Sequence, residues 1–130
     1  MSVTVSVDIA PGELVDKITI LEIKLERITD GAKVANVRIE YDTLLKARDA
    51  AIPKSEKLDQ LTSELKQINE TLWEVEDDIR DCERAKNFGD SFVKLARAVY
   101  VTNDQRMAVK RQINDLLGSP LVEEKSYAAY

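Results

Sequence analysis

The sequence of 130 residues contains no histidine, one cysteine, three prolines and four glycines. Without histidine, the chain lacks the commonest general base and the commonest metal ligand. Acid–base chemistry would therefore need carboxylates, lysine, tyrosine or Cys82. A lone cysteine excludes an internal disulfide, which fits a reducing cytoplasm. Few prolines and glycines leave few places for the chain to turn, so the elements between them are expected to be long.

A clustered basic surface is also missing. The 19 lysines and arginines are interleaved with 24 aspartates and glutamates, and the net charge is −5. Nucleic-acid-binding proteins usually gather basic residues on one face, and membrane-surface helices set a basic polar face against an apolar one. Residues 1–7 have neither the charged start nor the apolar run of a secretory signal. We therefore expect a cytoplasmic protein with no nucleic-acid or membrane partner.

Hydrophobic periodicity predicts an all-α fold. Apolar residues recur at spacings of three and four in four segments, which are separated by glycine or proline. The third segment is an unbroken heptad repeat from Leu58 to Cys82, so Cys82 is expected to be a buried, inert thiol. The prediction is one domain over residues 1–130, an antiparallel bundle of four helices at about 11–30, 33–52, 54–88 and 90–117.

Turn and cap residues indicate where these helices begin and end. Pro11 suits the first turn of the first helix, and Asp30–Gly31 is expected to end it. Ser55 is expected to cap the third helix and Asp90 the fourth. A break in the fourth helix at Thr102–Asn103 is left open, because a second cap signal lies there.

The two ends of the chain are expected to be non-helical. Val3, Val5 and Val7 alternate with polar residues, which indicates a short extended arm. A single strand is not stable alone, so the arm needs a partner such as a second subunit. The tail over residues 121–130 is expected to be irregular, with Tyr127 and Tyr130 packing back on the bundle.

The third helix is much longer than the first two, so the tip of the third and fourth helices should project beyond them. Two helices can cover only part of the apolar surface of such a tip, and a partner chain is the economical way to cover the rest. We therefore expect a homo-oligomer, with a dimer favoured. The tip residues are Ile79, Cys82, Phe88, Phe92 and Leu95.

A polar cluster interrupts the apolar face of the fourth helix. Successive residues of a helix are rotated by about 100°, so four polar residues lie on the same side of the helix as the core residue Leu117. They are Asn103, Arg106, Lys110 and Asn114. Unpaired charge there would cost several kcal/mol, so neighbouring helices must supply partners. Arg106 is expected to contact Glu76, Asn69 or Glu22. The candidate ligand-binding residues are Glu22, Asn69, Trp73, Glu76, Arg80, Asn103, Arg106, Lys110 and Asn114.

Two interpretations of this cluster are open. A closed, fully paired network would fix the register of the helices and leave the protein a self-associating interaction module. Carboxylates that converge with Arg106 and Lys110 on an open cavity would instead indicate an enzyme or binding protein for a phosphate- or carboxylate-bearing metabolite. No catalytic residue or cofactor is predicted. No metal site is predicted either, because the acidic run from Glu74 to Asp81 winds around its helix as a solvated face does.

Several segments together are similar to a known family. They are PGELVDKITILEIK at 11–24, Trp73 with EDDIR at 76–80, LARAVY at 95–100, Asn103–Asp104 and EEKSY at 123–127. The chain resembles, over nearly its whole length, a family of short bacterial proteins known only as a domain of unknown function. The resemblance implies a bacterial cytoplasmic protein whose relatives are encoded near surface-polysaccharide glycosyltransferases. It implies no activity, so it assigns no catalytic residue.

Overall fold

The fold is all-α, as the sequence predicts. The computed structural model describes residues 2–130, and that range contains four helices and no strand. Within it, no helix combines the length and hydrophobicity needed to cross a bilayer. The helices are α1 (Pro11–Arg27), α2 (Gly31–Ala51), α3 (Glu56–Arg84) and α4 (Asp90–Leu116).

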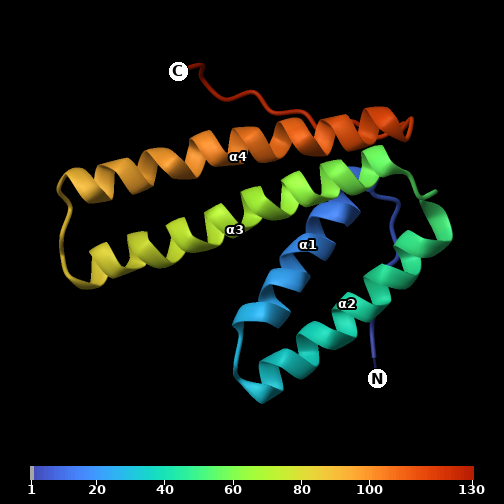
Figure 1. The fold of residues 1–130 in the computed structure, drawn as a ribbon, viewed down its shortest axis with the longest axis horizontal. Helices are drawn as coiled ribbons and strands as arrows, with labels where there is room; N and C mark the ends of the chain where they lie inside the picture. The colour runs from blue at the N-terminus through green and yellow to red at the C-terminus, as the bar shows by residue number, and fades with distance from the viewer. Residues whose placement is uncertain (1) are drawn as a thin grey trace.

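The four helices form two hairpins that cross. The long helices α3 and α4 lie side by side, and the shorter hairpin of α1 and α2 runs obliquely away from them (Figure 1). The helix α1 packs against all three others, whereas α2 packs against α1 alone among the helices. The first helix is therefore central, and two of its faces are buried.

The boundary between α1 and α2 differs from the prediction. The first helix ends at Arg27, and the Asp30 side chain accepts hydrogen bonds from the amides of Ala32 and Lys33 at 3.0 and 3.1 Å. Asp30 thus caps the start of α2, and the prediction that Asp30–Gly31 ends the first helix is wrong. An aspartate before glycine suits either role, because its carboxylate satisfies free amides at a helix start.

The predicted boundaries of α3 and α4 agree better with the structure. The Ser55 hydroxyl accepts from the amide of Leu58 at 3.1 Å, which confirms the cap of α3. The fourth helix begins at Asp90, as its predicted range has it, but the capping residue is Gly89 rather than Asp90. It then continues without interruption through Thr102–Asn103, so there is no break at that point.

The apolar core lies where α1 meets α3 and α4. Leucines of the heptad repeat on α3 face aliphatic residues of α4 across the start of α1, as the periodicity predicts. The buried core residues are Val15, Leu58, Leu61, Leu65, Val109 and Ile113, with Ile52, Ile68 and Leu117 packed against them.

The tip of the α3–α4 hairpin extends past the α1–α2 hairpin (Figure 1). Phe88 and Val93 there are 51% and 52% exposed. Cys82 is only partly buried in the single chain, so the prediction of a fully buried thiol is wrong. The helices α1 and α2 are too short to reach the tip, and its apolar residues therefore remain partly uncovered.

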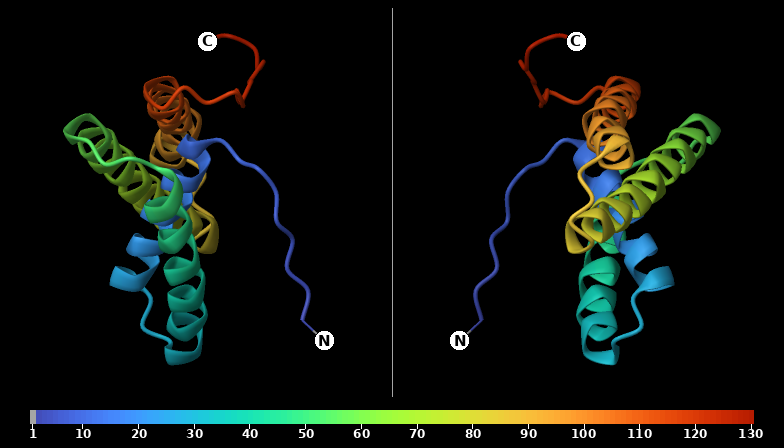
Figure 2. Two further views of the ribbon diagram at one scale, coloured as in Figure 1. Left: turned by 90° about the vertical axis from the view of Figure 1, so that its right-hand side faces the viewer. Right: turned by 90° about the vertical axis from the view of Figure 1, so that its left-hand side faces the viewer.

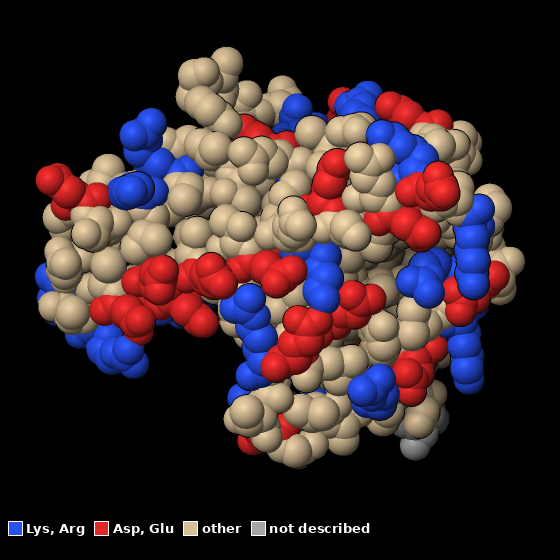
Figure 3. Space-filling view, in the orientation of Figure 1, with Lys and Arg blue, Asp and Glu red and all other residues tan. Residues whose placement is uncertain are grey.

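The N-terminal arm is extended and exposed. It runs away from the helices (Figure 2), and Val3, Val5 and Val7 are 79%, 81% and 70% exposed. No strand pairs with it among residues 2–130. An acidic band follows α3 (Figure 3), where Glu74, Asp77, Asp78 and Asp81 are exposed. These carboxylates point to solvent, as expected for a solvated face.

Candidate functional site

The polar cluster is centred on Asp16, a fully buried carboxylate in α1. Its Oδ1 accepts hydrogen bonds from Arg106 Nε and from Asn69 Nδ2, both at 2.9 Å. Arg106 Nη2 pairs with the other oxygen, Oδ2. The guanidinium thus grips the carboxylate with two parallel bonds, the strongest geometry for such a pair. This hydrogen bonding raises the pKa of Arg106 despite the opposing effect of burial.

Thr19 closes the inner side of the cluster. Asn69 Nδ2 also donates to Thr19 Oγ1 at 2.9 Å, and the Thr19 hydroxyl donates to the carbonyl of Asp16 at 2.8 Å. Every buried side-chain nitrogen or oxygen of the described residues has a partner. The inner half of the cluster is therefore a closed network that ties α1 to α3 and α4.

Lys110 forms the outer half. Its Nζ donates to Glu13 of α1 at 2.6 Å and lies 2.9 Å from Glu123 of the C-terminal tail. Burial lowers the pKa of Lys110, but its hydrogen bonds with the two glutamates outweigh this effect, and the net shift is upward. Lys110 is therefore charged at neutral pH, with one carboxylate from the fold and one from the tail.

Gly12 allows the start of α1 to lie directly on α4. Its amide donates to Asn114 Oδ1 at 2.7 Å. A Cβ at this position would lie 2.5 Å from the carbonyl oxygen of Lys110, which is backbone and cannot swing away. The close approach brings Glu13 and Asp16 within reach of α4, so the absence of a side chain at Gly12 positions the site.

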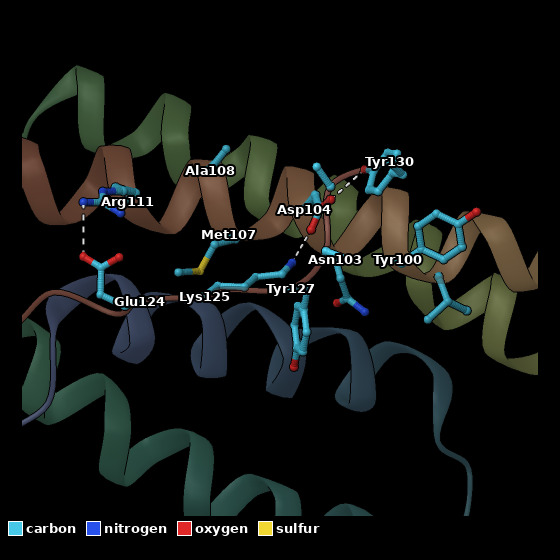
Figure 4. Close-up of a pocket in the computed structure, with 13 residues that line it drawn as sticks. Tyr100, Asn103, Asp104, Met107, Ala108, Arg111, Glu124, Lys125, Tyr127 and Tyr130 are labelled. Carbon is cyan, nitrogen blue, oxygen red and sulfur yellow. Dashed lines mark hydrogen bonds and ion pairs between the residues drawn. The ribbon is translucent and has the colours of Figure 1, made fainter.

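The tail returns along α4 (Figure 4). Lys125 pairs with Asp104, and the Tyr130 hydroxyl donates to the same carboxylate at 2.6 Å. These hydrogen bonds, first from Lys125 and then from Tyr130, lower the pKa of Asp104. The same bond to Asp104 raises the pKa of Tyr130. The centres of the Tyr130 and Tyr100 rings lie 5.2 Å apart, so Tyr130 contacts α4 as expected, although it remains 79% exposed.

Tyr127 does not pack back on the helices. Its side chain is 84% exposed, and its ring is contacted by Lys125, whose Nζ lies 5.5 Å from the ring centre. The prediction that Tyr127 packs on the bundle is therefore wrong. The residue lies at the rim of two cavities instead.

Two open cavities adjoin the cluster. The first, here called the charged pocket, has a volume of about 390 Å³. It is lined by Glu13, Asn103, Arg106, Met107, Lys110, Glu123, Lys125 and Tyr127. The second, the tail pocket, lies between α4 and the tail and has a volume of about 850 Å³ (Figure 4). Asn103, Met107, Lys125 and Tyr127 line both, so the two cavities meet.

Five of the nine predicted site residues belong to this arrangement. Asn69 and Arg106 meet at Asp16, Asn103 and Lys110 line the charged pocket, and Asn114 holds Gly12.

The other four predicted residues lie elsewhere. Glu22 lies 3.7 Å from Lys66 and accepts from the Tyr41 hydroxyl at 3.3 Å. Glu76 and Arg80 pair with each other one turn apart on α3, as exposed charges do. Trp73 is partly buried and makes no hydrogen bond to the cluster among the described residues.

The cluster's acidic partners were not foreseen. Arg106 pairs with Asp16, not with Glu76 or Glu22, and Lys110 pairs with Glu13 and Glu123. A signal for Asp16 was present, because around the helix axis it lies between Ile20 and Ile23, which widen the apolar stripe. No sequence signal placed the tail, since its course depends on exposed ion pairs.

A model of a family of unknown function, DUF6165, matches residues 5–130. The chain therefore belongs to this family, and the resemblance found in the sequence is confirmed at that level. No curated protein and no solved structure matches the chain.

Proposed function

Because membership of this family brings no established activity, we propose from the site itself that the protein binds a small ligand bearing a carboxylate or phosphate. The observation that carries the proposal is the charged pocket, an open cavity on which Arg106, Lys110 and Lys125 converge with Glu13 and Glu123. Ligand sites in helical proteins are built in this way, from side chains that face one another on different helices.

Arg106 supplies a preorganised donor. The buried Asp16 fixes its Nε and Nη2, while the side chain remains 29% exposed on the pocket wall. No described residue accepts a hydrogen bond from its Nη1. A ligand oxygen would meet a donor whose orientation is already set, which lowers the entropic cost of binding.

Lys110 supplies a positive charge, and one of its two carboxylate partners can be exchanged for a ligand. It is paired twice, with Glu13 from α1 and with Glu123 from the tail. Glu123 is 48% exposed and belongs to a segment without regular structure. An incoming anion can replace Glu123 without leaving the buried ammonium unpaired, because Glu13 remains.

The segments that carry the family resemblance also support the proposal, because three of them meet at this pocket. The PGELVDK start supplies Glu13, the Asn103–Asp104 step lies on α4, and the EEKSY end supplies Glu123, Lys125 and Tyr127. Residues far apart in the sequence are thereby gathered around one open cavity.

Calorimetric titration with inorganic phosphate and with succinate tests the proposal. Wild type should show saturable binding of at least one of them, and Lys110→Met should lose it. Lys94→Met is the matched control, since Lys94 is an exposed lysine of the same helix. Absence of saturable binding to wild type, or equal binding by folded Lys110→Met, would overturn the proposal.

Self-association is a second candidate, and a different observation supports it. The exposed arm and the partly uncovered tip of α3 and α4 are two apolar surfaces that a second copy of the chain would cover. A homodimer, and with it the role of an interaction module, remains a prediction. The cytoplasmic location and the link to surface-polysaccharide assembly also remain predictions. Light scattering at micromolar concentration tests the dimer, and a clean monomer mass would refute it.

A further inference from the structure

Tyr127 has no structural role that explains its position. Its side chain is 84% exposed, and its hydroxyl makes no hydrogen bond to any described residue. The neighbouring Tyr130 differs, because its hydroxyl and ring are both used in docking the tail. A single exposed tyrosine is ordinary on a protein surface. The location of this one is what matters.

The Tyr127 ring lies where the charged pocket meets the tail pocket, and it lines both. The ammonium of Lys125 lies 5.5 Å from its centre, a distance at which a cation is attracted to the face of the ring. No described ring stacks on it, whereas the Tyr100 and Tyr130 rings pack together. Tyr127 therefore presents an aromatic surface beside the cationic groups.

Met107 lies on the same junction. It lines both cavities and comes from α4, one turn before Lys110. A thioether makes favourable contacts with aromatic rings and adapts to their shape. The junction thus offers a sulfur and an aromatic face next to Arg106 and Lys110. The tail pocket, at about 850 Å³, has the size of cavities that hold small organic ligands.

We propose that the ligand is an anion carried on an aromatic ring, with the ring against Tyr127 and Met107 and the anion at Arg106 and Lys110. This inference rests on the proposed function and adds the class of the ligand. Stacking of a flat ring on an aromatic side chain strengthens binding. An aryl phosphate should therefore bind roughly tenfold more tightly than inorganic phosphate.

Calorimetry with three probes tests the ligand class: inorganic phosphate, phenyl phosphate and cyclohexyl phosphate. Wild type should bind phenyl phosphate about tenfold more tightly than inorganic phosphate, and more tightly than cyclohexyl phosphate. Tyr127→Ala should lose this gain but keep its affinity for inorganic phosphate. Tyr127→Phe is the matched control and should retain the gain, because it keeps the ring.

The outcomes separate this inference from the proposed function. If inorganic phosphate binds but phenyl phosphate binds no more tightly, the aromatic ligand class is wrong and the anion site stands. If cyclohexyl and phenyl phosphate bind equally, the contact is merely apolar and the aromatic class is also wrong. If Tyr127→Ala retains the full gain, the ring does not lie on Tyr127. If succinate binds and none of the three phosphates does, the anion site stands and the aromatic ligand class is wrong. If succinate does not bind either, the proposed function itself fails.

Discussion

Asp16 of α1 and Arg106 of α4 are separated by 90 residues in the sequence and are joined by two hydrogen bonds. The Asp16 side chain is only 1% exposed, whereas that of Arg106 is 29% exposed. The inner end of the pair therefore belongs to the fold, and the outer end belongs to the charged pocket. The same contact holds α1 against α4 and orients the donor that faces a ligand.

Arg106→Leu should destabilise the protein by about 3 kcal/mol, the lower end of the range for breaking a buried pair. The substitution leaves the Asp16 carboxylate buried, with Asn69 as its remaining side-chain donor. The lower end is expected because Arg106 keeps some contact with solvent. Urea denaturation measures the change in the free energy of unfolding.

Arg80→Leu is the control for this measurement. Arg80 pairs with Glu76 on the exposed face of α3, and its loss should change stability by no more than about 0.5 kcal/mol. The double variant Asp16→Asn/Arg106→Leu should recover part of the loss, because no unpaired carboxylate remains. Equal effects of the two arginine substitutions would show that the Asp16 pair does not hold the fold.

Gly12→Ala should destabilise the protein by roughly 1–3 kcal/mol through overpacking. The added Cβ would lie 2.5 Å from the backbone carbonyl oxygen of Lys110 and 2.8 Å from Asn114 Oδ1. Gly31→Ala is the matched control, because a Cβ there meets nothing within 4 Å. Its effect should be neutral or slightly stabilising, since alanine favours helix. Thermal melts of the two variants should shift in clearly different ways.

The sequence was sufficient for the core of the α3–α4 hairpin. The heptad repeat predicts that Leu58, Leu61 and Leu65 are buried, and they are. The same reasoning places Val109 and Ile113 in the core. These apolar residues recur with the helical period, and α3 and α4 pack along their length. Their buried positions can therefore be predicted from local geometry.

The partners of the polar residues did not follow from that geometry. Arg106 was expected to contact Glu76 or Asn69 of α3 or Glu22 of α1, but its acidic partner is Asp16 of α1. The reason is that α1 is buried on two faces, and Asp16 and Thr19 lie on the second of them. A prediction that allows only one buried stripe per helix therefore misplaces both Asp16 and Thr19. The contacts of Glu123 and Lys125 depend on the path of an irregular tail, which no period encodes.

The contacts that hold the tail on α4 should weaken at both acid and alkaline pH. Hydrogen bonds from Lys125 and Tyr130 lower the pKa of Asp104 from its ordinary value of 3.8. Their contribution is therefore present above that value and is lost as the pH falls through the lowered pKa. The bond to Asp104 raises the pKa of Tyr130 from 10.0. Its contribution is present below that value and is lost as the pH rises through the raised pKa.

Carbon-13 signals of the Tyr130 ring report this docking during a pH titration. Asp104→Asn should remove the acid transition, because an amide does not titrate there. Tyr130→Phe should remove the alkaline one and can be followed through the signals of the Tyr100 ring, which Tyr130 contacts. An acid transition that persists unchanged in Asp104→Asn would mean that another group controls the tail.

Labelling of Cys82 by a thiol reagent should slow as the protein concentration rises. Cys82 is partly exposed in the single chain and lies in the last turn of α3, which ends at Arg84 beside the uncovered tip. A second copy that covers the tip would also protect the thiol, and mass action makes this protection depend on concentration. Val93→Glu should label at one fast rate at all concentrations, because a charge at this 52% exposed position disfavours an apolar interface without disturbing the fold. Urea-denatured protein gives the reference rate for a fully accessible thiol. If the wild-type rate is the same from micromolar to submillimolar protein and equals that of Val93→Glu, then no second copy covers the tip.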